Sequence, residues 1–242
     1  MSLPVIPLTK RTWETKHYPK PIEYQAFNIG LQSILLQVSD EDTTSADRIE
    51  ALRQVVSGCV VNLSPEEVDA LPIFVIEKLF LKIRSISVSE QVSLNFKCNH
   101  KKDGDEEPCG CPIKLSINLE DIDYKEYEGH TNKLQDNGYY FILQYPNLKN
   151  AAKIPEQAKP TDIVRLLLKQ ICNEDGEVWE FGEYSDAEQT AFVAGLSLEL
   201  QRKVMQDFFL KQPHIHYEEM VKCPKCGKEH KLTFSNLNQV FM

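Results

Sequence analysis

The chain has 242 residues, of which 42% are hydrophobic and 26% charged, and its formal net charge at pH 7 is −9. This composition is typical of a globular protein large enough to fold without disulfides. The acidic balance disfavours non-specific binding to nucleic acid, and no apolar run reaches the length of a membrane span. Because seven cysteines do not fit a secreted disulfide framework, we expect synthesis in a reducing cytoplasm.

The first 21 residues predict an extended basic arm, either tethered or mobile. Prolines interrupt any helical period there, and basic residues outnumber acidic ones. The prolines are Pro4, Pro7, Pro19 and Pro21, and the basic residues are Lys10, Arg11, Lys16 and Lys20.

Residues 22–86 predict a helical segment that begins with a short strand over 22–27. Four helices are expected: one over 30–38, one capped by Thr44 or Ser45, one starting at Ser64–Glu67, and one over 72–84. The last of these is apolar on nearly all sides and therefore predicts a buried central helix.

Residues 87–146 predict a region of β-hairpin and strand. Apolar side chains alternate with polar ones up to Cys98 and again after Cys111, which is typical of two paired strands. A further strand is expected over 139–145. The loop between the paired strands forms an acidic tip with Asp103, Asp105, Glu106 and Glu107.

The rest of the chain predicts a helical segment over 147–212 and a C-terminal hairpin over 213–242. Thr161 is expected to cap a helix that runs to Cys172, a capping box opens another helix at Ser185, and a third spans 198–210. We expect residues 22–242 to form one compact α+β unit. Its central and C-terminal hairpins would be joined by a zinc-ribbon-like cysteine site, with the helical segment inserted between them.

Five of the seven cysteines lie in two clusters, Cys98/Cys109/Cys111 and Cys223/Cys226. Each cluster sits where one predicted strand turns into the next, and Cys-x-x-Cys turns supply two zinc ligands at a suitable separation. The sequence therefore predicts a structural zinc site.

Two ligand sets compete. In the shared arrangement, a single zinc ion is bound by Cys98, Cys109, Cys223 and Cys226. In the separate arrangement, Cys98 joins His100, Cys109 and Cys111, while Cys223, Cys226 and His230 need a fourth ligand. We favour the shared arrangement because the second cluster alone is one ligand short. The alternative without metal, in which all the thiols are simply reduced, stays open.

No catalytic constellation is present in the sequence. It contains no phosphate-binding glycine loop, no Gly-x-Ser-x-Gly motif and no His-Glu-x-x-His motif. A zinc ion held by four cysteines has no open position for water or substrate. We therefore predict that the protein is not an enzyme, and we place a zinc hydrolase or a redox protein last among the functions considered.

The order of several segments resembles the baseplate hub and hub-assembly proteins of T-even-type contractile-tailed bacteriophages. The likeness extends from about Tyr24 to the C-terminus and is weakest over 151–212. It is carried by the helix Leu71–Ser85, the segment Ser87–Glu90, the strand end Phe96–Cys98, Cys109-Gly110, Asn118–Ile122, Tyr145-Pro146 and the Cys223–Gly227 turn. The chain departs from the family pattern in Cys111 and in its long acidic tip, which leaves the ligand set undecided.

The resemblance implies a non-enzymatic phage protein that acts in baseplate hub assembly, as a hub component or an assembly chaperone. Its partners would be other baseplate hub or tape-measure proteins, without a membrane, and it is compatible with an oligomer. It would be found in the host cytoplasm during assembly or in the tail baseplate of the virion. The alternative from the residues alone is a zinc-ribbon protein associated with nucleic acid, favoured by Lys222, Lys225, Lys228 and Lys231 near the second cluster.

Overall fold

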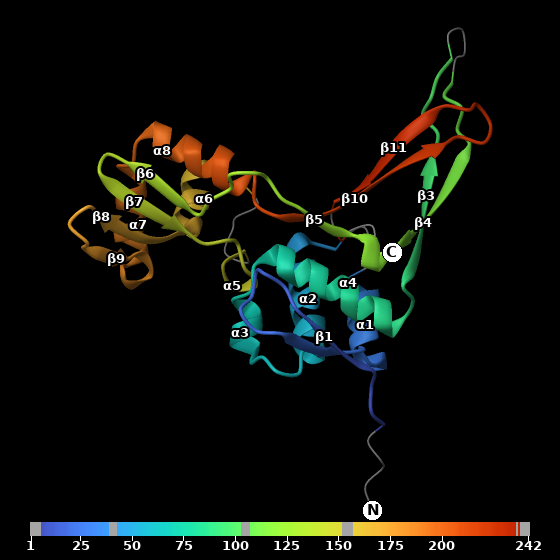
Figure 1. Ribbon diagram of the computed structural model, residues 1–242, viewed down its shortest axis with the longest axis horizontal. Coiled ribbons are helices and arrows are strands. Elements are labelled where there is room, and N and C mark those ends of the chain that lie inside the picture. The colour runs from blue at the N-terminus through green and yellow to red at the C-terminus, as the bar shows by residue number, and fades with distance from the viewer. Residues whose placement is uncertain (1–5, 39–42, 103–106, 152–156, 236, 238–242) are drawn as a thin grey trace, which may run out of the picture. The chain divides into compact units, whose positions relative to one another are not determined.

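The computed structural model describes residues 6–38, 43–102, 107–151, 157–235 and 237, and it contains both helices and strands, as expected for an α+β fold (Figure 1). Parts of three expected features lie outside these residues. They are residues 1–5 of the basic arm, Asp103, Asp105 and Glu106 of the acidic tip, and residues 238–242 of the C-terminal segment.

The internal contacts group the described residues into two compact units. Unit 1 comprises Met1–Val68, Phe74–Lys125 and His214–Met242, and unit 2 comprises Asp69–Ile73 and Glu126–Pro213. The sequence led us to expect a single unit over residues 22–242, with the insertion at 147–212. The segment boundaries expected from the sequence stay a prediction, and each unit is described separately below.

In unit 1 the expected basic arm contributes a strand. β1 (Lys10–Trp13) pairs antiparallel with β2 (Ile22–Gln25), with Trp13 opposite Ile22. The backbone N–H of Ala26 also donates to the carbonyl of Thr9, at 2.9 Å. These backbone hydrogen bonds tether the described part of the arm to unit 1.

The four helices expected in the first third of the chain are confirmed. They are α1 (Ile29–Gln37), α2 (Ser45–Cys59), α3 (Pro65–Asp69) and α4 (Ile73–Ser87). Thr44 caps α2, and Ser64 and Glu67 form the reciprocal capping box of α3, with backbone-to-side-chain distances of 3.2 and 2.9 Å. The apolar sequence of α4 is reflected in its burial, which includes Phe74, Val75, Ile76, Leu79, Phe80, Leu81 and Ile83.

Polar side chains of α4 fix the segment that follows β4. Lys78 is buried and donates a hydrogen bond to the carbonyl of Ile122. Lys82 lies 2.9 Å from the carboxylate of Glu120, which also accepts from the Ser85 hydroxyl. These bonds connect α4 to the short helix η1 (Leu119–Asp121) and to β5 (Asp123–Lys125).

Two β-hairpins complete unit 1 (Figure 1). β3 (Gln91–Lys97) pairs with β4 (Pro112–Asn118), so that Val92, Leu94 and Phe96 face Ile117, Leu115 and Ile113 across the strands. β10 (His214–Lys222) pairs with β11 (Glu229–Phe234) on one side and with β5 on the other. The alternating apolar pattern thus gives both hairpins near the expected positions.

Unit 2 is built on a four-stranded antiparallel sheet. Its strands are, in spatial order, β6 (Lys133–Asp136), β7 (Tyr139–Leu143), β8 (Leu168–Asn173) and β9 (Val178–Glu180). β6 and β7 are joined by Asn137-Gly138, both with positive φ (47° and 79°). This two-residue turn matches the twist of antiparallel strands, and the Asn-Gly pair tolerates its backbone conformation.

The remaining elements of unit 2 are mainly helical. They are α5 (Leu148–Ala151), α6 (Pro160–Leu167), η2 (Phe181–Glu183), α7 (Asp186–Ala194), α8 (Leu198–Lys203) and the π-helical turn η3 (Val204–Phe209). The predicted capping box of α7 is confirmed, with the Ser185 hydroxyl and the Glu188 carboxylate bonded to each other's backbone N–H. Among the described residues, none of the helices has the length and apolar character that a membrane span requires.

The helix predicted from Thr161 to Cys172 is wrong in its second half. α6 begins after Lys159, whose backbone N–H donates to the Asp162 carboxylate, and it ends at Leu167. Leu168–Asn173 instead forms β8 between β7 and β9. Cys172, expected at the end of that helix, therefore lies half-buried in a strand.

Candidate metal centre

The two cysteine clusters lie at the ends of the two hairpins of unit 1. Cys98 directly follows β3, Cys111 directly precedes β4, and Cys109 lies two residues before Cys111. Cys223 directly follows β10, and Cys226 lies in the turn before β11. The hairpin pattern in the sequence therefore placed each thiol at a strand end.

Backbone hydrogen bonds shape the first hairpin end. The N–H of Cys98 donates to the carbonyl of Cys111, and the N–H of Gly110 donates back to the carbonyl of Cys98, each at 2.9 Å. The N–H of Cys109 donates to the carbonyl of His100 at 2.8 Å. Gly110 adopts φ of +63°, a conformation that glycine takes without the steric cost that a Cβ carries. The loop is thus closed tightly behind the thiols.

The second hairpin end has a similar design. The N–H of Cys223 donates to the carbonyl of Lys228 at 2.8 Å, and the N–H of Gly227 donates to the carbonyl of Cys223 at 3.0 Å. Gly227 also has a positive φ, of +74°. In such a turn both cysteine side chains can point to the same side, as a metal-binding Cys-x-x-Cys turn requires.

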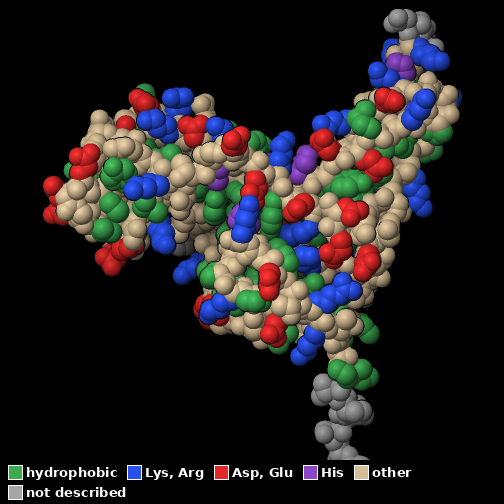
Figure 2. Space-filling model, viewed as in Figure 1, with side chains coloured by type: hydrophobic (Ala, Val, Ile, Leu, Met, Phe, Trp, Pro, Cys, Tyr) green, Lys and Arg blue, Asp and Glu red, His purple; other side chains and the backbone are tan. Residues whose placement is uncertain are grey.

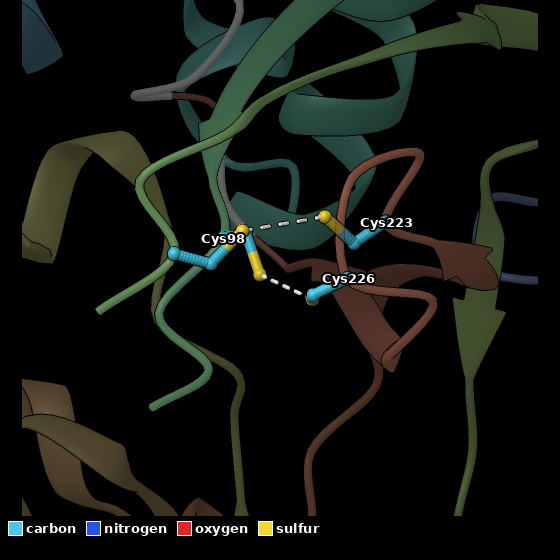
Figure 3. Close-up of side chains that lie close together, drawn as sticks. Cys98, Cys223 and Cys226 are labelled. Atoms are coloured by element: carbon cyan, nitrogen blue, oxygen red, sulfur yellow. Dashed lines mark hydrogen bonds between the residues drawn. The ribbon is translucent and has the colours of Figure 1, made fainter. Parts of the chain in front are cut away.

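Four thiols from the two ends come together. The Sγ atoms of Cys98, Cys109, Cys223 and Cys226 all lie within 4.8 Å of one another. The Sγ–Sγ distance is 3.6 Å between Cys98 and Cys226 and 3.9 Å between Cys109 and Cys223. Figure 3 shows Cys98 turned toward Cys223 and Cys226 of the other hairpin. This is the grouping expected in the shared arrangement, and four thiols this close can hold a metal ion.

The local environment shifts the pKa values of two of these thiols in opposite directions. Cys98 and Cys223 are each only 1% exposed and pack with Ile113. Burial raises the pKa of the Cys98 thiol to about 12. The pKa of Cys223 is lowered to about 6 because the backbone N–H groups of Cys226 and Lys225 donate to its sulfur. Backbone donors thus stabilise a thiolate at Cys223, and the thiolate is the form of cysteine that binds metals.

The additional candidate ligands lie around this group. The Nε2 atom of His230 is 3.2 Å from the Sγ of Cys98, as a hydrogen-bonding partner of a ligand would be. Cys111 is half-buried, and burial together with a hydrogen bond to Cys223 raises the pKa of its thiol. His100 contributes its backbone carbonyl to the first hairpin end. Within the described residues, neither His100, Cys111 nor His230 joins the four clustered thiols.

Two histidines outside the cysteine clusters pack against aromatic rings. In unit 1, His17 makes edge contacts with Phe74 and Tyr124, with ring centroids 4.9 and 5.1 Å apart. In unit 2, His130 stacks on Tyr145 and on Phe208. Neither belongs to the thiol cluster, and no local sequence pattern signals such long-range ring contacts.

Comparison with known proteins identifies a family for this chain. The sequence model of the family described as T4 bacteriophage base plate protein matches residues 6–242, nearly the whole chain. No curated protein and no solved structure matches. The family match confirms the resemblance seen in the sequence and includes both cysteine clusters. The chain therefore belongs to the T4 bacteriophage base plate protein family.

Proposed function

We propose that the protein acts in assembly of the phage tail baseplate by binding other proteins, as a hub component or as an assembly chaperone. The observation that carries this proposal is the family match over residues 6–242. It works in the host cytoplasm during assembly or in the tail baseplate of the virion. Its partners are other baseplate hub or tape-measure proteins.

A non-enzymatic role agrees with the chemistry of the cysteine cluster. The donors available there are four thiols, which would fill all four positions of a tetrahedral metal ion. Catalytic zinc sites, in contrast, use three protein ligands and leave a position for water or substrate. The cluster is therefore suited to a structural role rather than to catalysis.

We further propose that Cys98, Cys109, Cys223 and Cys226 bind one structural zinc ion. In a tetrahedral site with Zn–S bonds of about 2.3 Å, the sulfurs are ~3.8 Å apart. The two Sγ–Sγ distances of 3.6 and 3.9 Å lie on either side of that value. The ion would join two hairpins that are far apart in the sequence, while His230 would donate to Cys98 from outside the ligand set.

The zinc proposal is tested by elemental analysis of the purified chain and of three variants, Cys98→Ser, Cys226→Ser and Cys111→Ser. The shared arrangement requires about one zinc per chain, lost in the first two variants and retained in the third. Loss of zinc from Cys111→Ser, with retention in Cys226→Ser, would support the separate arrangement. Absence of zinc, with no uptake when it is added, would reject both.

The assembly role is tested by co-expression with the baseplate hub and tape-measure chains of the same phage. We expect a stable complex with at least one of them that survives size-exclusion chromatography. Failure to co-purify with any of them would argue strongly against the proposal. A tail sheath protein serves as the control chain, since unspecific association would retain it as well.

A second candidate function is supported by the lysines around the hairpin ends. All of them are exposed, and Figure 2 shows Lys, Arg and His side chains gathered near the end of the β3–β4 hairpin. They are Lys97, Lys101, Lys102, Lys114, Lys222, Lys225, Lys228 and Lys231. Such a surface would suit a contact with the phosphate backbone of a nucleic acid, although the net charge of the whole chain is −9.

Salt dependence distinguishes this second function from protein binding. Phosphate contacts release counterions, so affinity for a nucleic acid falls steeply as salt rises. A fluorescent single-stranded and a double-stranded oligonucleotide should then bind at low salt and dissociate at physiological salt. No binding at low salt would remove this candidate.

A further inference from the structure

Unit 2 contains a surface hollow of about 670 Å³ lined by aromatic side chains. It lies where β7, β8 and β9 meet α7, and none of the lining residues is Lys or Arg. The side chains that define it are Tyr139, Ile171, Trp179, Phe181, Tyr184 and Phe192. We call it the aromatic hollow.

The rim of the aromatic hollow is exposed, whereas its base is buried. Tyr139, Tyr184 and Phe192 have exposed fractions of 43%, 41% and 40%, and Phe181 is only 4% exposed. Phe192 packs on Phe181 with ring centroids 5.9 Å apart, and Tyr139 lies 6.3 Å from Trp179. Several rings thus present their faces or edges to solvent around a fixed base.

These rim rings are not needed to fill the core of unit 2. Phe181 belongs to the buried cluster and Trp179 packs against it, whereas Tyr139, Tyr184 and Phe192 are exposed and are not members of the cluster. Grouped exposed aromatic area of this kind marks interaction surfaces, where Tyr, Trp and Phe are enriched. The hollow is thus available for a partner without disturbing the fold.

The charge next to the aromatic hollow is acidic. Asp136 and Glu188 line it directly, and residues 174–188 carry seven acidic residues and no basic one. Of these seven, all of which are described, Asp186 alone forms an ion pair, with Arg165. The surface therefore complements an apolar group surrounded by positive charge.

We propose that the aromatic hollow binds a segment of a partner protein that carries an aromatic or large aliphatic side chain flanked by lysines or arginines. The apolar side chain would enter the hollow between Phe192 and Trp179, and the basic residues would lie over the acidic rim. This inference rests on the proposed role in protein–protein binding, to which it adds the chemistry of the partner. Burial of the anchor would provide affinity, and the charges would provide specificity and faster association.

The chain provides its own reporter for a binding test. It has two tryptophans, Trp179 in the aromatic hollow and Trp13 in β1 of unit 1. The peptide acetyl-GKKFKKG-amide is titrated into the ¹⁵N-labelled full chain, and the indole N–H signals of both tryptophans are followed. We expect a saturable shift of Trp179 with Trp13 unchanged, and an affinity that falls as salt rises.

Two control peptides separate the apolar from the electrostatic contribution. In acetyl-GKKSKKG-amide the anchor is removed, and in acetyl-GEEFEEG-amide the charge is reversed. Each should bind at least about tenfold more weakly, because a buried aromatic anchor and complementary charge each contribute 1.4 kcal/mol or more. Equal binding of the charge-reversed peptide, or no shift of Trp179 with the first peptide, would overturn the inference.

Variants of the protein locate the site. Phe192→Ser and Tyr184→Ser should weaken binding of the first peptide at least about tenfold, with little loss of stability because both rings are about 40% exposed. The matched control is Leu198→Ser, which removes an 83% exposed apolar side chain of unit 2 outside the hollow and should leave binding unchanged. The amide spectrum of each variant shows whether it is folded. Unchanged binding by folded Phe192→Ser and Tyr184→Ser would reject the site.

The same variants separate this inference from the proposed function. If baseplate chains co-purify with the wild-type protein and equally with Phe192→Ser, the hollow is not their docking site, while the assembly role stands. If the peptide binds in the hollow but no baseplate chain co-purifies, the docking chemistry stands and the assembly role fails. Loss of co-purification specifically in Phe192→Ser and Tyr184→Ser supports both.

Discussion

In unit 2, the four-stranded sheet and helices α6 to α8 bury a cluster of twelve apolar residues, whereas the described residues at the ends of the two hairpins in unit 1 form a buried cluster of three, Cys98, Ile113 and Cys223. In the sheet of unit 2, β7 and β8 are each hydrogen-bonded to a strand on both sides. β3 and β4, in contrast, form an isolated two-stranded ribbon.

This difference indicates how each region is stabilised. A two-stranded ribbon is marginal in water unless something else holds it, whereas a larger sheet packed on helices is stable by apolar burial. Metal ligation can replace a missing core, because the site does not exist in the unfolded chain and the free energy of metal binding therefore becomes free energy of folding. We therefore expect the hairpin ends to depend on zinc and unit 2 to be independent of it.

The largest expected effect is that of removing the metal or one of its ligands. In Cys98→Ser, or after chelation, amide protection should be lost at the ends of β3–β4 and β10–β11, because apparent binding energies of structural zinc reach about 10–16 kcal/mol. Hydrogen exchange measured by mass spectrometry, with zinc added back to the chelated protein, checks this.

Cys172→Ser is the matched control for that variant. Cys172 is a half-buried cysteine in β8 of unit 2 and is not one of the four clustered thiols. It should retain zinc and normal protection of the hairpins. Equal loss of protection in unit 2 after chelation would show that the two regions do not differ in the way proposed.

The converse test removes an apolar core residue from unit 2. Phe208 is fully buried and stacks with His130 and Tyr145. Phe208→Ala should destabilise unit 2 by about 3–5 kcal/mol, since it leaves a cavity, without changing the zinc content. Urea unfolding followed at Trp179 measures the loss of stability. A drop in zinc stoichiometry would contradict the expectation that unit 2 and the zinc site are stabilised independently.

A smaller effect concerns the pH dependence of unit 1. Burial raises the pKa of Glu77 in α4 from 4.5 to about 7. The folded state then binds a proton that the unfolded state has released, so this contribution to stability is complete below pH 4.5 and is lost as pH rises through about 7.

Replacement of Glu77 tests the predicted direction of this pH dependence. Because part of the Glu77 side chain reaches the surface, we expect a loss of only about 1–2 kcal/mol across this pH range, absent in Glu77→Gln. Denaturant unfolding at several pH values measures it. Glu66→Gln, on the exposed surface of α3, is the control and should keep the wild-type slope.

The smallest effects come from matched helix caps, one in each unit. Ser64 caps α3 in unit 1 and Ser185 caps α7 in unit 2. Each change to Ala should cost about 1 kcal/mol or less in its own region, since one backbone donor loses its partner. Hydrogen exchange near each cap should rise locally, and Ser→Thr at the same positions should restore protection.

Much of the fold could be predicted because its signals are local. The capping boxes at Ser64 and Ser185 and the apolar sequence of α4 depend on residues within a few positions of one another. The alternation leading to Cys98 likewise placed the first thiol at a strand end. These patterns need no knowledge of distant segments, since one helix turn or one strand carries the complete signal.

β8 shows where local pattern misleads. Leu168 and Ile171 are three residues apart, which is helical spacing, and both are buried. In a regular strand they would face opposite sides of the sheet, but the pairing with β7 shifts register between Ile142 and Leu143. This bulge turns both side chains toward the core. Pairing with β7 therefore favours a strand over a helix in this segment.

The aromatic hollow was missed for a similar reason. Tyr139, Trp179, Tyr184 and Phe192 come from separate elements and have no common spacing in the sequence. The acidic run over 174–188 can be read directly from the sequence. Its position beside exposed rings is a property of the folded unit.

The sequence by itself determined the two hairpins and the cysteines at their ends, because each rests on residues that are close along the chain. It also determined the family, through a match that extends over residues 6–242. Only the tertiary structure decided that Cys98 and Cys109 meet Cys223 and Cys226, and which of the nearby candidates stay outside the cluster. Contacts across more than a hundred residues leave no local period, since they depend on how complete elements pack. The same physical reason separates the acidic run, which the sequence displays, from the hollow it borders, which exists only after folding.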